Sequence, residues 1–177
     1  MSDLETLKFP IGRFTPPAAY TPALIKSYIA DIAEFPSLLR HEVSQLTDEQ
    51  LDTPYRPGGW TIRQVVHHCA DSHSNSLIRF KLALTEEEPT IKPYWEDRWA
   101  ELPDAALPVH PSLLLLEGLH ERWVTLLNAL DASQFEKVFI HPEHGKNISL
   151  YENTANYSWH GKHHLAHITT LKRSKGW

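Results

Sequence analysis

The chain has 177 residues, of which 41% are hydrophobic, and a formal net charge of −5 at pH 7. This length suits one domain with a sizeable core, so we expect a single domain over residues 1–177. Acidic and basic residues are interspersed without a basic stripe, which argues against a nucleic-acid partner and favours small molecules. No apolar run approaches the roughly 20 residues needed to cross a bilayer, so no membrane partner is expected.

The compartment is predicted from the start of the chain and from its cysteine content. The first twelve residues contain no cationic start followed by an apolar run, so we predict no secretory signal. The single cysteine, Cys69, fits a reducing compartment, and together these features predict a cytoplasmic protein. Cys69 falls on the apolar stripe of a predicted helix, where a buried thiol is usually inert rather than nucleophilic.

Two long helical patterns occupy the first half of the chain. The first follows an irregular N-terminal arm, with Thr21 suited to cap it and Pro22 suited to its first position. Its apolar spacing predicts a helix that ends near Gln45. A loop rich in proline and glycine then leads to a second apolar stripe, which predicts a helix from about Trp60 to Thr85.

The connection over residues 86–111 is long, rich in proline and aromatic. Such a connection often covers a functional site, although it can equally be a loop that packs on the fold. A third helix is predicted over residues 112–130, with His120 on its buried face. We expect His120 to be a core histidine satisfied by hydrogen bonds, with an approach to a metal site as the alternative.

The last part of the chain combines a short β segment with a fourth helix. Extended runs at residues 137–141 and 147–150 flank a turn at Gly145 and predict a β-hairpin. The fourth helix is predicted over residues 153–174, and it ends before Gly176. Four amphipathic helices with one short β excursion predict an all-α fold, a four-helix bundle.

Four of the eight residues from His160 to His167 are histidines, and this density indicates a metal site. Residues four apart on a helix have Cβ atoms roughly 5–6 Å apart, so such a pair can bind one cation. His160 and His164 share an apolar stripe, whereas His163 and His167 share a polar one. We therefore expect the first pair to point inward and bind a metal, and the second pair to flank solvent. The alternatives are a hydrogen-bonded core pair, and a contact from His167 to a ligand or substrate.

A catalytic site of this kind has three protein ligands and an open position, so another helix must supply the third ligand. The second helix offers His67, His68 and His73, and helical phase does not choose between them. Asp71 is expected to be a solvated surface charge, with a role as a ligand or as an acceptor beside one as the alternative. The pair on the last helix is not part of an HExxH motif, so the glutamate base of the zinc proteases is missing.

Four sequence blocks carry a family resemblance: FPIG at 9–12, LDTPYR at 51–56, GWTIRQVVHH at 59–68, and the histidine-rich segment 159–168. With these blocks the sequence resembles the DinB superfamily, and in particular its YfiT-like members. That superfamily has a first ligand eight residues after a tryptophan that is followed by Ser or Thr, which from Trp60 gives His68. Its other two ligands are a pair four residues apart on the last helix, which matches His160 and His164.

The resemblance implies a four-helix bundle in up-down-down-up order, a homodimer, and one divalent metal ion per chain. Zinc is the first expectation and nickel the second, since imidazole ligands accept several metals. The implied activity is metal-dependent hydrolysis by an activated water, with no catalytic residue assigned. His67, Asp71 and Glu96 are candidates for a base.

Three other functions remain open. Members of the same superfamily resemble transferases that use low-molecular-weight thiols such as bacillithiol, and a metal-activated thiolate needs no catalytic carboxylate. A structural metal in a bundle that is not an enzyme is the second alternative, although such sites are typically rich in cysteine. A metal-free interaction module with a surface sensitive to pH is the third.

Overall fold

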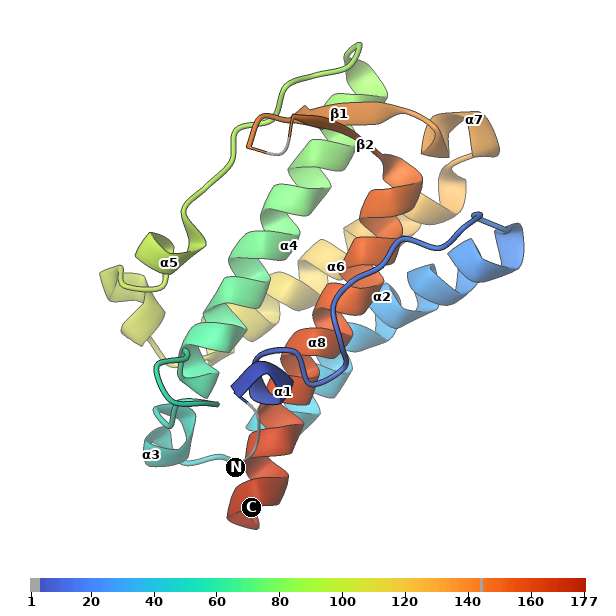
Figure 1. The fold of residues 1–177 in the computed structure, drawn as a ribbon. Helices are drawn as coiled ribbons and strands as arrows, with labels where there is room; N and C mark the ends of the chain where they lie inside the picture. Colours follow the sequence, from blue (N-terminus) through green and yellow to red (C-terminus); the bar gives the residue numbers. More distant parts are fainter. Residues whose placement is uncertain (1–3, 144) are drawn as a thin grey trace.

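The computed structural model describes residues 4–143 and 145–177, and four long helices form its frame (Figure 1). These helices are α2 (Pro22–Val43), α4 (Ile62–Thr85), α6 (His110–Ala129) and α8 (Leu150–Lys175). The shorter segments are α1 (Leu4–Lys8), α3 (Asp48–Leu51), α5 (Glu96–Trp99), the 3-10 helix η1 (Pro103–Ala106), α7 (Ala132–Phe135) and the strands β1 (Val138–His141) and β2 (Lys146–Ser149). None of the helices described is long and apolar enough to cross a membrane.

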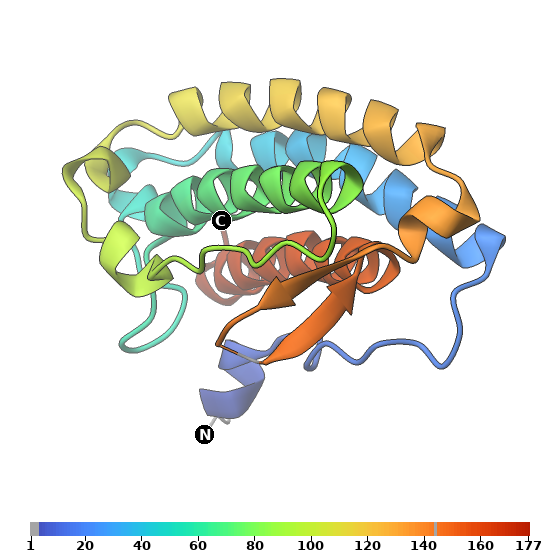
Figure 2. The same ribbon diagram turned by 90° about the horizontal axis from the view of Figure 1, so that it is seen from above.

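The long helices form a bundle in which sequence neighbours are not always spatial neighbours. Helix α2 packs against α6 and α8, and α4 packs against the same two helices, as Figure 2 shows from above. In Figure 1, α4 and α6 run in one direction and α2 and α8 in the other, so the predicted up-down-down-up order is confirmed. Because α4 and α6 run the same way, the connection between them must return along the length of the bundle.

The helix starts follow their capping residues. The side chain of Thr21 caps α2 as predicted, and Thr61 forms a capping box with Gln64 at the start of α4. Helix α8 begins earlier than predicted because Ser149, the last residue of β2, accepts a hydrogen bond from the amide of Glu152 at 3.1 Å. The strand therefore leads into the helix without a loop.

The predicted hairpin is confirmed, and it is tied to the long connection. Strands β1 and β2 pair antiparallel, with Val138 opposite Ser149. The amide of Ile91 donates to the carbonyl of Ile140 at 3.0 Å, and the amide of Ile140 donates to the carbonyl of Pro89 at 2.9 Å. The hairpin and the connection thus form one continuous wall beside α4 and α8.

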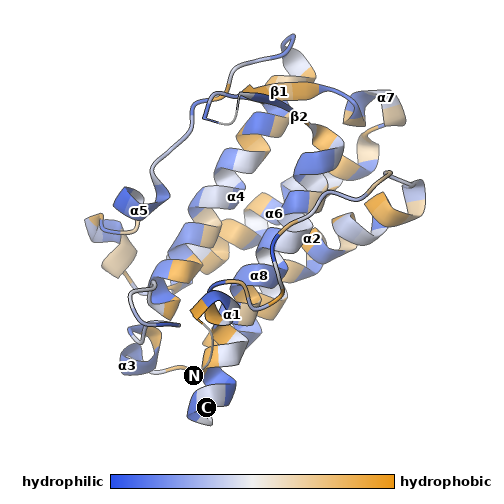
Figure 3. Cartoon of the chain, viewed as in Figure 1, coloured by the Kyte–Doolittle hydropathy of each residue, from blue (hydrophilic) through white to orange (hydrophobic). Residues whose placement is uncertain are grey.

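The core consists of two apolar clusters with a layer of histidines between them. Hydrophobic and hydrophilic residues alternate along all four long helices in Figure 3. In sequence, His73 lies between the two clusters on α4, His120 lies between them on α6, and His160 and His164 lie between them on α8. The bundle therefore buries a polar layer midway along its length, where each imidazole nitrogen needs a partner.

Candidate metal centre

The structure brings the three predicted ligands together. His68 comes from α4, whereas His160 and His164 come from successive turns of α8, and one ring nitrogen of each lies within 4.8 Å of the other two. Nε2 of His68 is 3.3 Å from Nε2 of His160. His164 is only 6% exposed, and its Nδ1 has no hydrogen-bond partner among the residues described. Converging imidazole nitrogens with an unpaired buried atom are the donor set that a divalent cation requires.

The other histidines of α4 are used elsewhere. His67 points towards the start of α6, where its Nδ1 is 2.7 Å from Oγ of Ser112 and its Nε2 is 3.0 Å from the carbonyl of Leu107. His73 is fully buried, and both of its ring nitrogens are hydrogen-bonded to other imidazoles. Both ring nitrogens of His67 and of His73 already have hydrogen-bond partners. His68 is therefore the α4 histidine that is placed to join the pair on α8.

The triad is electrically neutral at neutral pH. Burial, with a smaller contribution from His163, lowers the pKa of His68 to about 4. Burial also lowers the pKa of both His160 and His164 well below the ordinary histidine value. Since metals bind the neutral form of imidazole, protons do not compete for these nitrogens near pH 7.

The prediction that His163 and His167 flank solvent is wrong. They are only 7% and 3% exposed, respectively. Nε2 of His167 is 3.1 Å from the carbonyl of Lys8, and its ring stacks on Tyr55 with centroids 3.9 Å apart. The N-terminal arm and the loop after α3 cover this polar face of α8. The prediction failed because the periodicity of one helix cannot show that a segment distant in sequence will cover it.

A second group of histidines meets on α8. His163, His164 and His167 also have ring nitrogens within 4.8 Å of one another, and their Nδ1 atoms have no hydrogen-bond partner within the described part of the chain. This group shares His164 with the first triad. A neutral imidazole has one lone pair, so His164 cannot serve two cations at once in that form. The first triad differs in two ways. Its ligands come from two helices, and all three of its histidines line one pocket, whereas His167 of the second group does not line that pocket.

The pocket beside the first triad has a volume of about 390 Å³. Its lining includes all three triad histidines, together with Trp60, which precedes α4, and Tyr157 of α8. The long connection contributes Pro93, Tyr94 and Glu96, and the hairpin contributes His141 and Glu143. The connection therefore lines the pocket at the triad, which is the site that it was expected to cover.

Two further candidate residues lie outside the triad. Asp71 is half-buried, and so is less exposed than predicted, in a narrow cleft where burial and the charge of Asp104 raise its pKa. Cys69 is fully buried, as its place on the apolar stripe predicted, and burial raises the pKa of its thiol, which disfavours the thiolate.

His120 is a core histidine with hydrogen bonds at both ring nitrogens, as predicted. It contacts the triad only through His73, because His73 lies between it and His160. The sequence placed His120 inward, but the pattern of a single helix could not show which side chains it would meet there.

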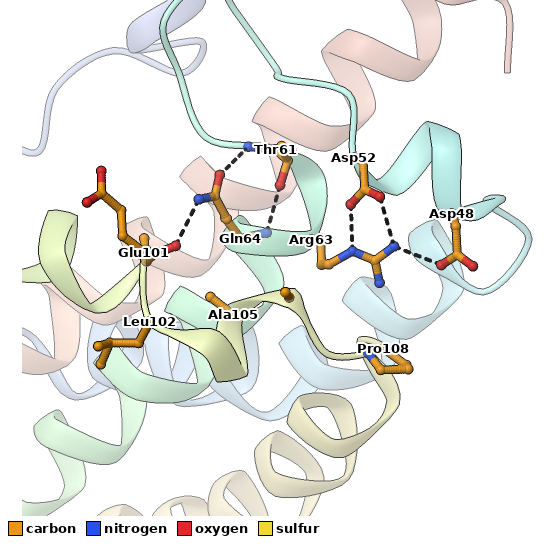
Figure 4. Close-up of a pocket in the computed structure, with 11 residues that line it drawn as sticks. Asp48, Asp52, Thr61, Arg63, Gln64, Glu101, Leu102, Ala105 and Pro108 are labelled. Atoms are coloured by element: carbon orange, nitrogen blue, oxygen red, sulfur yellow. Dashed lines mark hydrogen bonds and ion pairs between the residues drawn. The ribbon is translucent and has the colours of Figure 1, made fainter.

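A wider hollow of about 790 Å³ lies at the start of α4, and Figure 4 shows its lining. Arg63 is 7% exposed, and its guanidinium donates to Asp48 at 2.7 Å, to Asp52 at 2.6 Å and to the carbonyl of Leu107 at 3.2 Å. Gln64 is likewise held by Thr61 and by a backbone carbonyl. The side chains of Arg63 and Gln64 are therefore already held by hydrogen bonds within the protein and are not free to bind a ligand.

Comparisons with known proteins agree with this geometry. The model of the DinB superfamily matches residues 32–168. A protein of Bacillus cereus (strain 03BB102) is 53% identical over 98% of this chain and 100% of its own length, and one of Bacillus mycoides (strain KBAB4) is 52% identical over the same shares. The names of both describe candidate metal-dependent hydrolases.

A solved structure shares the fold closely. YfiT from Bacillus subtilis, described as a probable metal-dependent hydrolase with an unusual four-helix bundle topology, superimposes with a TM-score of 0.95 at 48% identity. The match covers 97% of this chain and 99% of that one. On its sequence blocks, its bundle order and these matches, the chain belongs to the DinB superfamily.

Proposed function

We propose that this protein is a metal-dependent hydrolase in which His68, His160 and His164 hold one divalent cation, with zinc favoured over nickel. The observation that carries the proposal is the convergence of three imidazole nitrogens from two helices at the wall of a pocket. The names of the relatives support the same class of activity.

The chain's own residues supply the surroundings that hydrolysis requires. When bound, the cation supplies a Lewis acid that lowers the pKa of a coordinated water or thiol. The ring of Trp60 lies 4.6 Å from that of His68 between centroids and restricts its orientation. Glu96 and Glu143 are the pocket carboxylates that can accept a proton, and Arg79 is the pocket's cationic side chain. These charged walls favour a small polar substrate.

A second candidate function is transfer of a low-molecular-weight thiol. In the part of the chain that the structure describes, no carboxylate is hydrogen-bonded to the triad, and a thiolate nucleophile needs no such base. Cys69 cannot supply the thiol because it is buried in the core. The thiol would therefore come from a second substrate that enters the pocket.

Metal content tests the proposed site. We expect about one divalent ion per chain in the wild-type protein, and loss of stoichiometric metal in each of His68→Ala, His160→Ala and His164→Ala. His67→Ala is the matched control, since this buried histidine precedes His68 but faces away from the triad. Elemental analysis of the purified variants gives the answer. Full metal content in all three triad variants would refute the site.

Activity assays separate the two reactions. The metal-loaded protein would be offered ester, amide and lactone panels without thiol, and separately monochlorobimane with bacillithiol, glutathione or cysteine. Thiol-independent turnover that is lost in His160→Ala supports hydrolysis, whereas thiol-dependent conjugation that is lost in the same variant supports transfer. Neither reaction, combined with unfolding on metal removal, would instead indicate a structural metal.

A further inference from the structure

A chain of imidazoles leads from the triad into the core and touches all four long helices. Nδ1 of His160 on α8 is 3.1 Å from Nε2 of His73 on α4. Nδ1 of His73 is in turn 2.8 Å from Nε2 of His120 on α6. Nδ1 of His120 is 2.6 Å from the backbone carbonyl of Ile32 on α2. His73 is 0% exposed and His120 is 2% exposed, so these contacts are shielded from water.

The backbone carbonyl of Ile32, at the inner end of this series of imidazoles, determines which nitrogen of each ring carries the hydrogen. The oxygen of Ile32 can only accept, so Nδ1 of His120 must carry its hydrogen. In a neutral ring the other nitrogen is then an acceptor, so Nε2 of His120 receives the Nδ1–H of His73. The same step repeats once more, and Nε2 of His73 receives the Nδ1–H of His160. The Nε2 of His160 is left with its lone pair, and it is this atom that faces His68.

The rings in the chain are neutral, as this assignment requires. Burial lowers the pKa of His120, at the inner end, to about 4. A charged His120 would donate from both ring nitrogens and would reverse the direction of the two imidazole–imidazole hydrogen bonds.

We propose that His73 and His120 are positioning residues that hold His160 in the one tautomer, and the one ring orientation, that presents an Nε2 lone pair to a divalent cation. The inference rests on the proposed function for the identity of the ligands. It extends that function by assigning a role to two core histidines that do not themselves bind the ion. Hydrogen bonds of this kind to metal-binding histidines fix the tautomer and raise the basicity of the ligand.

Packing around the chain restricts the rings further. The ring of Phe35 stacks on His73 with centroids 5.0 Å apart and lies 5.7 Å from His120. A Cβ at Gly161 would lie 2.9 Å from Cδ2 of Phe35, so glycine beside His160 allows α8 to approach this ring. If these positions only filled the core, apolar rings would serve without burying nitrogens that need partners.

The tautomers can be read directly in the wild-type protein. Long-range ¹H–¹⁵N correlation spectra of protein labelled at the histidine rings distinguish Nδ1–H from Nε2–H. We expect the Nδ1–H form for His120, His73 and His160, both in metal-free protein and in protein loaded with zinc. An Nε2–H form of His73 or His160 would overturn the inference, and this measurement does not depend on any variant folding.

Variants at the inner end test the effect on the metal. His120→Phe removes the acceptor for His73, and we expect zinc affinity to fall roughly 10–100-fold in a competition with a chromophoric chelator. His120→Gln restores an acceptor for His73 and a donor for Ile32, so it should recover most of that loss. His67→Phe is the matched control, because it removes a buried, hydrogen-bonded imidazole that is not part of the His160–His73–His120 series.

The outcomes separate this inference from the proposed function. If His160→Ala keeps its metal, the ligand assignment is wrong. The tautomers measured in the wild-type protein still report whether His160, His73 and His120 are hydrogen-bonded in series. If the triad variants lose the metal but His120→Phe binds zinc as tightly as the wild type, the ligand assignment stands and the positioning role is refuted. Equal losses in His120→Phe, His120→Gln and His67→Phe would also refute it, since packing alone would then explain the effect.

Discussion

Two buried polar regions of the bundle, one around Arg63 of α4 and one around the histidines of α8, differ in how completely their groups are hydrogen-bonded. The guanidinium of Arg63 has an acceptor for each of its three nitrogens. On α8, by contrast, Nδ1 of His163, His164 and His167 has no hydrogen-bond partner among the residues described. A fully paired buried group stabilises the fold, whereas an incompletely paired one indicates a missing ligand. The wider hollow therefore lies beside the fully hydrogen-bonded Arg63 region, whereas the smaller pocket lies beside the histidines that can bind a ligand.

Acid should affect the histidine region most. In metal-free protein the pKa of His68 and of His120 is about 4 in the folded state, against 6.5 for an unperturbed histidine. Between these values the unfolded chain binds more protons, so the free energy of unfolding should fall as pH falls from 6.5 to 4. Each unit of pKa difference contributes about 1.4 kcal/mol per group.

Urea unfolding at a series of pH values, with a chelator present, measures this loss. Arg63 keeps its charge over the whole window, so its guanidinium contributes nothing to the slope. A free energy of unfolding that stays constant over the window would show that the histidines are not buried in their neutral form.

Loss of the Arg63 side chain should destabilise the fold without affecting the metal. Arg63→Met removes charged hydrogen bonds to Asp48 and Asp52, and we expect a loss of about 2–3 kcal/mol in the free energy of unfolding. Metal content per folded chain should stay at the wild-type value. Arg40→Met is the control, because it breaks a more exposed pair with Glu117 and should cost less. Loss of metal in Arg63→Met would mean that the two regions are not independent.

His167→Ala distinguishes the two histidine groups of α8. We expect a loss of about 1–2 kcal/mol, because the variant removes a buried ring that packs on Tyr55, while the metal is retained. Denaturation and elemental analysis on the same preparation give both numbers. If His167→Ala loses the metal while His160→Ala keeps it, the cation is held by His163, His164 and His167 instead.

The smallest effect is expected at the rim of the Arg63 region. The side chain of Asp48 is 86% exposed, so Asp48→Asn should cost less than about 1 kcal/mol. Asp52 still pairs with Nε of Arg63 in that variant. A larger loss, measured by urea unfolding at low and high salt, would show that the exposed carboxylate is more than a screened surface charge.

The long elements could be predicted from the sequence because their signals are local. Apolar spacing and capping residues such as Thr21 predicted α2, α4, α6 and α8, and alternation around Gly145 predicted the hairpin. The short helices were not predicted, since a segment such as Asp48–Leu51 is too short for a helical period to be detected. The start of α8 was missed because a strand runs directly into it.

The site was predictable only where it depended on one helix. The shared face of His160 and His164 follows from their spacing, whereas the burial of His167 depends on Lys8, which lies 159 residues away in sequence. Phase could not choose between His67 and His68, because α4 is flanked by other elements on several sides and both rings are shielded. The family resemblance was needed for that choice.

The wall formed by the hairpin and the connection has a consequence for how relatives can diverge. The triad lies on long helices, where substitutions would disturb the core, whereas Pro93, Tyr94, Glu96 and Glu143 lie on segments that connect the long helices. Insertions and replacements accumulate more readily in such segments. Relatives can therefore acquire different substrates through substitutions on one side of the pocket, while the residues that hold the ion stay the same.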